Sequence, residues 1–308
     1  HPPGYPLHTL LGFLSCKLPF STAASRVGLV SLLAGVTAVL LAFGIVRRLT
    51  RSLWAAATAA LIFATGALFW RYASLAEVFA LNAALCLAVL YSVLRSVEAA
   101  GRGAARDLGR WLWLLAASLL WGLALCNHLS SVWLAPLLLL PLVSPWPGLG
   151  RFVVVSIGCV VALAVGLSPY LQIVWADALA LPRWGDPSTA AGFVHHLLRR
   201  DYGSLQLAIG GSGSPLGAPL AFLAEAPRQL GWILSPLALW GALLAGSRAV
   251  GRPLGALAPT GVRRDLAAAL VLLPVVCGPL FLLMFNIPVE GIGRQVVERF
   301  FILPIALG

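Results

Sequence analysis

The sequence predicts an all-α protein, a polytopic membrane bundle of about eight or nine spanning helices. Of the 308 residues, 60% are hydrophobic and only 10% are charged, whereas soluble domains carry about 25% charged residues. The apolar residues form long runs without charge, and a spanning helix needs about 20 such residues. Arginines gather in the short segments between the runs. These three observations together favour a membrane protein.

The charge-free runs define the expected spans in chain order. We expect spans at 27–46, 53–70, 78–94, 111–126, 129–145, 152–172, 229–247 and 266–286. A ninth run begins near Phe300. We expect residues 1–308 to form one multi-pass domain that is truncated at both ends. Between the sixth and seventh spans, 173–228 is expected to be a long non-cytoplasmic loop with a short amphipathic helix.

The net charge of +11 is explained by topology rather than by nucleic acid. With His1 on the non-cytoplasmic side, four short loops become cytoplasmic and hold twelve of the 21 basic residues, as the positive-inside rule predicts. Those loops are 47–52, 95–110, 146–151 and 248–265. The unusual polar residues then converge on the opposite, non-cytoplasmic face. We therefore expect membrane lipid as a partner and the chemistry on the outer face.

Two polar residues, Glu77 and Asn82, enter the start of the third span shortly after Arg71. Ionisable groups in a membrane segment are costly and usually have a function, so Glu77 is a functional candidate. The alternative is that Glu77 stabilises the helix start or pairs with Arg71. Asn127 and His128 interrupt an uncharged stretch in the same way, and an ordinary polar turn is the alternative there.

The stretch 184–203 is the richest in polar residues. We expect Asp186 to cap a short surface helix, with Pro187 as its first residue and Gly203 as its stop. Arg199–Arg200 can grip a phosphate or touch lipid headgroups. His195–His196 are adjacent and do not share a helix face, so we expect no metal site. The predicted apolar stripe of this helix comprises Phe193, Leu197 and Leu198.

Both ends of the chain carry further candidates. Prolines make the first seven residues stiff, and the segment is expected to line a polar cavity with His1 and Tyr5. Near the last run, Glu298 and Arg299 either form an interface salt bridge or place Arg299 against an anionic substrate. The five scattered cysteines are expected to be packing residues. The sequence has no P-loop, no Rossmann glycine pattern, no Gly-x-Ser-x-Gly and no His-Glu-x-x-His motif.

Five motifs occur in an order and spacing that resemble a known family. They are His1–Leu7, Ala76–Asn82, Cys126–His128, the 184–203 stretch and Val297–Phe300. Together they resemble the protein O-mannosyltransferases of the transmembrane protein 260 type and their bacterial relatives. The resemblance implies a clan-C glycosyltransferase whose site faces the endoplasmic reticulum lumen in a eukaryote or the periplasm in a bacterial inner membrane.

The same resemblance implies the substrates. The donor would be a polyprenyl-phosphate sugar, dolichyl phosphate mannose in a eukaryote, with no other cofactor. The acceptor would be a Ser or Thr hydroxyl on extracellular protein domains such as receptor immunoglobulin-like folds. In the family, the main catalytic acid lies in a Gly-Asp-Ser-Gly-Glu-like segment upstream of the equivalent of His1. A lipid or solute transporter and an inactive binding subunit remain alternatives.

On this hypothesis the candidate residues take different roles. Glu77 is a secondary catalytic candidate. The donor phosphate would be bound by Arg200, Arg299 and Arg71. The substrate pocket would be formed by His1, Tyr5, Asn82, Asn127, His128, Asp186, His196, Tyr202 and Glu298.

Overall fold

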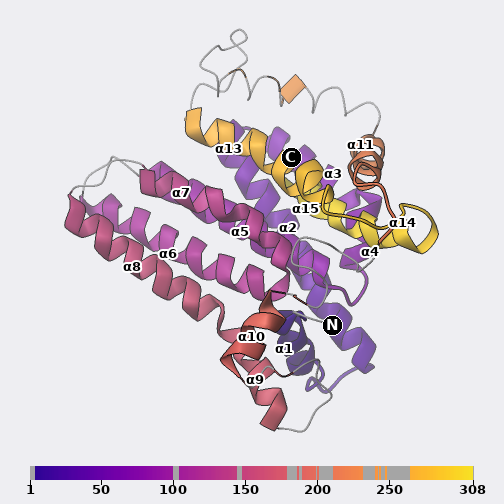
Figure 1. Ribbon diagram of the computed structural model, residues 1–308. Coiled ribbons are helices and arrows are strands. Elements are labelled where there is room, and N and C mark those ends of the chain that lie inside the picture. The colour runs from indigo at the N-terminus through magenta and orange to yellow at the C-terminus, as the bar shows by residue number, and fades with distance from the viewer. Residues whose placement is uncertain are drawn as a thin grey trace.

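The computed structural model describes residues 4–99, 104–143, 148–178, 186, 189–198, 200, 211–231, 240–241, 243, 247 and 264–307 (Figure 1). Every described element is helical. The helices are α1 (Pro6–Ser15), α2 (Ala23–Thr50), α3 (Leu53–Thr65), α4 (Ala67–Ala73), α5 (Val78–Ala99), α6 (Ala104–Asn127), η1 (Leu129–Leu134), α7 (Ala135–Val143), α8 (Leu149–Gly166), η2 (Ser168–Tyr170), α9 (Leu171–Ala178), α10 (Ala190–Leu197), α11 (Gly217–Leu230), α13 (Arg264–Val275), η4 (Val276–Leu280), α14 (Gly291–Glu298), η5 (Arg299–Phe301) and α15 (Ile302–Leu307). The predicted all-α class is confirmed.

Four described helices are long and apolar enough to cross a membrane. They are Ala23–Thr50, Val78–Ala99, Leu108–Asn127 and Leu149–Val174, and they match four of the predicted windows. The predicted span 53–70 is broken at Gly66, where α3 and α4 meet at a bend of 67°. Counted as one, this pair gives a fifth span. The described residues therefore contain four or five candidate spans, and the expected eight or nine are not confirmed.

Two predicted spans are shorter than expected. The windows 129–145 and 266–286 correspond to apolar helices at Leu129–Pro141 and Leu266–Leu280. The second contains Pro274 and, after it, a non-helical Gly278 followed by Pro279. Proline interrupts a helix because it has no N–H to donate and its ring clashes with the preceding turn. The window 229–247 lies largely outside the described residues.

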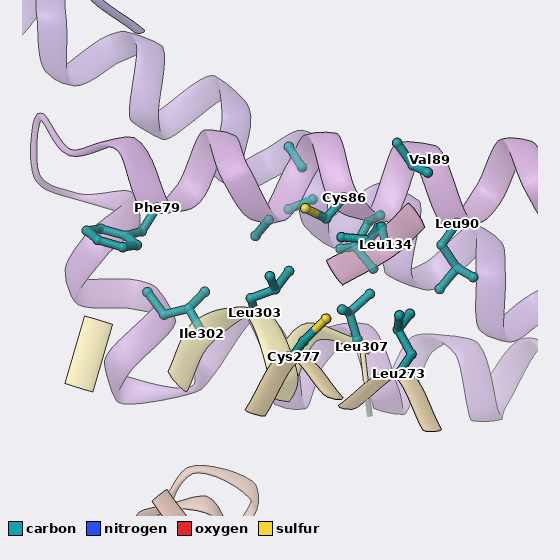
Figure 2. Close-up of a cluster of buried hydrophobic side chains, with 14 of the residues drawn as sticks. Phe79, Cys86, Val89, Leu90, Leu134, Leu273, Cys277, Ile302, Leu303 and Leu307 are labelled. Carbon is teal, nitrogen blue, oxygen red and sulfur yellow. The ribbon is translucent and has the colours of Figure 1, made fainter. Parts of the chain in front are cut away.

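Helix α5 forms the centre of the bundle. It packs against α2 on one side and α6 on the other, and α6 in turn packs against α8. Figure 2 shows apolar side chains of α5 facing the C-terminal helices across the core, where Leu273, Cys277 and Leu303 meet them. All five cysteines are free, and Cys86, Cys126 and Cys277 are buried, as expected of packing residues. Helix α5 and the C-terminal helices thus contribute to one core.

The start of α10 corrects the sequence prediction. The N-cap is Thr189 rather than Asp186, since the Thr189 hydroxyl accepts a hydrogen bond from the Gly192 N–H at 3.0 Å. A Cβ on Gly192 would lie 1.8 Å from the Asp186 carbonyl oxygen, so only glycine fits there. The helix ends at Leu197, and Gly203 lies outside the described residues. Of the predicted stripe, Phe193 and Leu197 pack on the protein and Leu198 is exposed.

Candidate functional site

The beginning of α5 is fixed to α2 by one serine. The Ser31 hydroxyl donates to the Glu77 carbonyl oxygen at 2.9 Å, and the Glu77 N–H donates to the same hydroxyl oxygen at 3.2 Å. This pair of bonds holds the junction before Val78, the first residue of α5. Glu77 therefore stands at a helix N-terminus, where backbone N–H groups favour a negative charge.

Aromatic rings gather around His128, directly after α6. Its imidazole stacks on Tyr5, with ring centroids 5.6 Å apart and planes 14° apart. The rings of Phe79 and Phe300 pack against the same imidazole, with centroids 5.5 and 5.4 Å from its centroid. These four residues, called the aromatic platform below, come from α5, η5 and the segments that precede α1 and η1. The platform joins the two ends of the described chain at the start of α5.

A small pocket lies beside the aromatic platform. Its lining residues are Phe79, Asn82, Ser130, Cys277, Phe281, Arg299, Phe300, Ile302 and Leu303. It has room for about one water-sized group. The Arg299 guanidinium lies over the Phe79 ring, 5.6 Å from its centroid, and the Arg299 Nε donates to the Val296 carbonyl at 3.1 Å. A positive charge is therefore held at a largely apolar pocket.

Two predicted asparagines support this region from the inside. Asn82 is only 3% exposed, and its Oδ1 accepts a hydrogen bond from the Ser131 hydroxyl at 2.8 Å. Asn127 is fully buried, and its Nδ2 donates to the Val78 carbonyl at 3.0 Å. The Asn127 Oδ1 is enclosed without a hydrogen-bond partner among the described residues. Asn82 lines the pocket, whereas Asn127 braces the start of α5.

The phenol of Tyr72 on α4 lies near several of the predicted charged residues, with the Arg71 guanidinium 5.9 Å from its ring centroid. The charges that act on the Tyr72 hydroxyl are those of Arg299, Arg71, Glu77 and Glu298. The hydroxyl donates to the Gln295 carbonyl at 3.4 Å, which links α4 to α14. The structure therefore brings these four candidates to one end of the bundle, next to the aromatic platform.

Glu298 does not pair with Arg299. Its carboxylate accepts from the Arg294 Nε at 2.5 Å, one turn earlier on α14. Arg294 also lies 3.4 Å from Glu225 on α11, whose side chain is 13% exposed. Of the two alternatives that the sequence left open, the salt bridge between Glu298 and Arg299 is not formed, because Glu298 pairs with Arg294 within α14. Arg299 lines the pocket instead.

His8 on α1 is a further titratable group near this end. Its Nε2 is buried and has no hydrogen-bond partner among the described residues. Burial lowers the pKa of His8 from its ordinary value of 6.5, and the negative charge of Glu77 opposes that shift.

The comparisons with known proteins agree with this arrangement of motifs. Residues 1–145 match the model of the "Protein O-mannosyl-transferase TMEM260 N-terminal domain". Over 251 residues the chain is 33% identical to protein O-mannosyl-transferase TMEM260 of Mus musculus, covering 78% of this chain and 34% of the mouse protein. The chain is related to the TMEM260-type protein O-mannosyl-transferases.

A second relative supports the same relation. The chain is 31% identical over 224 residues to the TMEM260 protein O-mannosyl-transferase of Dictyostelium discoideum, covering 69% of this chain and 27% of that protein. The chain thus spans about a third of the length of these curated TMEM260 relatives. No solved structure matches the chain.

Some predicted residues of the TMEM260-type motifs lie elsewhere or are not described. Arg200 and Asp186 are exposed and do not line the pocket, and His196 lies on α10, next to α1 and η2. His1 and Tyr202 lie outside the described residues. Among the described residues, no cluster of three or more His, Cys, Asp or Glu side chains is placed to hold a metal ion.

Sequence reasoning missed several residues of the site. Phe79 and Phe300 belong to the motifs that indicated the TMEM260 type. Their position beside polar candidate residues was a signal that could have identified them. Tyr72 follows Arg71 directly and was likewise visible. Glu225 had no such signal, because its ion-pair partner Arg294 is 69 residues away in the sequence.

Proposed function

We propose that the chain is the membrane part of a glycosyltransferase that moves mannose from a polyprenyl-phosphate donor to Ser or Thr hydroxyls of extracellular protein domains. The observation that carries the proposal is the pocket in which Arg299 and Asn82 meet beside the aromatic platform, in a chain related to the TMEM260 type. One positive charge at an apolar pocket suits a phosphate joined to a lipid.

The reaction requires two kinds of group. The acceptor oxygen forms a bond to the anomeric carbon of mannose while the bond from that carbon to the phosphate oxygen breaks. A base takes the hydroxyl proton, and the phosphate leaves with the bonding electrons and needs positive charge beside it. Arg299 would supply that charge, with Arg71 near it. Glu77 would orient the acceptor, and the family resemblance puts the main base upstream of His1.

The finer assignments belong to the same proposal. For a eukaryotic protein the donor would be dolichyl phosphate mannose and the compartment the endoplasmic reticulum membrane. For a bacterial protein the compartment would be the inner membrane. In either case the face bearing Tyr5, Glu77, His128 and Arg299 would be lumenal or periplasmic. Acceptors would include immunoglobulin-like folds of receptors.

A transfer assay tests the proposal. The full-length protein in proteoliposomes is given dolichyl phosphate mannose and a purified immunoglobulin-like acceptor domain, and mass spectrometry locates any hexose added. We expect mannose on Ser or Thr. Movement of the lipid across the membrane without transfer would support a transporter instead, and binding without either activity would support an inactive subunit. Either result contradicts the proposal.

The same assay compares how much Arg299 and Arg200 each contribute to the rate of transfer. Removing one group that stabilises charge in a transition state costs about 100-fold or more in rate, so Arg299→Ala should reduce transfer by at least that factor. Arg200→Ala tests the sequence-based assignment of Arg200 to the same phosphate. Because Arg200 is exposed and does not line the pocket, we expect the smaller loss from it. The reverse ranking would move the phosphate to Arg200.

A further inference from the structure

Asn82 is almost completely buried, yet its amide nitrogen forms no hydrogen bond with any residue that the structure describes. The side chain is 3% exposed and lines the pocket. Its Oδ1 accepts a hydrogen bond from the Ser131 hydroxyl at 2.8 Å, whereas its Nδ2 donates to none of the described residues. The two N–H bonds of Asn82 are therefore available to a ligand in the pocket.

A short chain of hydrogen bonds holds the oxygen of this amide. The Ser131 hydroxyl has one hydrogen atom, and an amide oxygen can only accept, so that hydrogen points to Asn82. The Cys86 sulfur lies 3.4 Å from the Ser131 oxygen and then serves as the donor to it. The indole N–H of Trp121 donates to the Ser131 carbonyl at 2.8 Å and holds η1 in place. In this arrangement the amide oxygen faces Ser131, and the amide nitrogen points away from Ser131.

The other groups that line the pocket determine which kind of ligand could bind to the Asn82 amide. Arg299 supplies a positive charge, held by the Phe79 ring and the Val296 carbonyl. The Ser130 hydroxyl is hydrogen-bonded to the Nδ1 of His128 at 2.8 Å. Much of the remaining lining is apolar or weakly polar, with Cys277, Phe281, Ile302 and Leu303. Asn82 and Arg299 both donate, and donors in surroundings of low polarity interact strongly with an anionic oxygen.

We propose that this pocket is a single-oxygen subsite, in which the Asn82 amide donates to one non-bridging oxygen of a lipid-linked phosphate while Arg299 balances the charge. The space suits one oxygen, because it has room for about one water-sized group. A non-bridging phosphate oxygen only accepts and carries negative charge, so it suits the donors of Asn82 and Arg299 better than a neutral sugar hydroxyl does. This inference rests on the proposed function and gives Asn82 a specific role in it.

The test compares lipids that differ only in the phosphate. The protein in detergent micelles is titrated with dolichyl phosphate and with dolichol, and lipid retention is measured by native mass spectrometry. The unsubstituted protein should retain dolichyl phosphate at least tenfold more tightly than dolichol. Asn82→Asp keeps the shape but replaces the two N–H bonds with an acceptor oxygen, and it should reduce this preference to less than twofold.

Two further variants separate orientation from packing. Ser131→Ala keeps the Asn82 amide but releases it from the chain of hydrogen bonds, and it should weaken the preference for dolichyl phosphate by several fold. Ser96→Ala is the matched control. It also removes a buried hydroxyl, the one on α5 that donates to the Arg110 carbonyl at 2.9 Å, at a position that does not line the pocket. It should retain the full preference.

Each outcome decides the inference. If Asn82→Asp binds dolichyl phosphate as the unsubstituted protein does, the subsite is wrong. The subsite is also wrong if the loss appears with dolichyl phosphate mannose but not with dolichyl phosphate, because Asn82 would then hold the sugar. If Asn82→Asp does not fold, judged by its unfolding temperature, the comparison of Ser131→Ala with Ser96→Ala decides.

The transfer assay separates this inference from the proposed function. If phosphate binding depends on Asn82 but no mannose is transferred, the subsite inference stands and the proposed function is overturned. Mannose transfer that survives Asn82→Asp with an unchanged KM for the lipid would overturn the subsite and leave the proposed function.

Discussion

Helices α5 and α8 are both apolar and both long enough to cross a membrane, yet they differ in what surrounds them. In the most apolar window of α5, 78% of the residues are buried inside the protein, against 11% for the span that contains α8. α5 lies between α2, α6 and the C-terminal helices, whereas α8 packs chiefly on α6. Buried polar side chains occur on α5 and not on α8. In this bundle the polar content of a span, rather than its apolar length, indicates where the chemistry lies.

The outer helix α8 contacts α6 through closely approaching backbones. A substitution that disrupts this contact is expected to have the largest effect on stability. A Cβ on Gly122 of α6 would lie 2.5 Å from the Leu163 carbonyl oxygen on α8. Small residues allow such an approach between membrane helices. Gly122→Ala should therefore destabilise the fold by about 3 kcal/mol, at the upper end of overpacking costs. Unfolding in mixed detergent and SDS micelles measures the loss.

Gly109→Ala on the same helix is the control for Gly122→Ala. No atom lies within 4 Å of a Cβ at Gly109, and alanine favours a helix over glycine by about 1 kcal/mol. This variant should be as stable as the original protein or more stable. Equal losses from both substitutions would mean that α8 is not attached through Gly122.

A matched pair of valines tests the comparison of α5 with α8 directly. Val89 on α5 is fully buried and Val160 on α8 is 65% exposed; Figure 2 shows Val89 on α5. Val89→Ala should cost about 2 kcal/mol, because the removed methyl groups leave a cavity. Val160→Ala should change stability by less than about 0.5 kcal/mol. The same unfolding measurement applies, and similar values for the two would remove the distinction between the helices.

The position of the N-terminal end of α5, beside the pocket, also depends on helices that are distant in the sequence. Glu225→Gln tests this dependence. The Glu225 carboxylate contacts Arg294 on α14 and accepts from Gln229 at 2.6 Å, while Gln229 accepts the Leu68 N–H of α4 at 2.9 Å. If the proposed transfer holds, Glu225→Gln should raise the KM for the lipid donor about threefold with kcat unchanged. That corresponds to the 0.2–1 kcal/mol typical of exposed ion pairs.

Arg228→Gln is the control for Glu225→Gln in steady-state transfer kinetics. Arg228 lies 3.5 Å from the same carboxylate, but its side chain is 57% exposed and is not linked to α14. Its KM should change by less than twofold. A fall in kcat instead of a rise in KM on Glu225→Gln would contradict a positioning role.

The smallest expected effect concerns His8, beside the start of α5. Because burial lowers the pKa of His8 in the fold, the unfolded chain takes up the proton first as the pH falls below 6.5. Stability is therefore complete above pH 6.5 and declines below it, until the pH reaches the folded pKa. His8→Gln should flatten the decline of the unfolding temperature between pH 7.5 and 5. Identical pH profiles would contradict this account.

The sequence predicted the parts of the molecule that have a local signature. Runs of apolar residues located the spans at α2, α5, α6 and α8, and isolated polar residues at a span end located Glu77 and Asn82. The apolar helices at Leu129–Pro141 and Leu266–Leu280 are shorter than the predicted windows, and for the second of them hydropathy does not register Pro274 or the non-helical Gly278. The cap at Thr189 was misplaced at Asp186, since both residue types cap helices and only the geometry distinguishes them.

Long-range contacts had no such signature. Glu225 pairs with Arg294 across 69 residues, and Gln229 meets Leu68 across 161. The pocket itself is formed by α5, η1, η4, η5 and α15, which are far apart in the chain. Patterns within one helix predict which face is buried but not which other helix covers it.

The bonds around His128 limit what its ring can do. The Ser130 N–H donates to the His128 Nδ1 at 3.2 Å, so this nitrogen carries the lone pair and the ring proton resides on Nε2. The tautomer is thereby set by the cap of η1. A ring in this state has no basic nitrogen left for an attacking hydroxyl, and protonating Nδ1 would break the cap. If the proposed transfer holds, His128 is therefore not its general base.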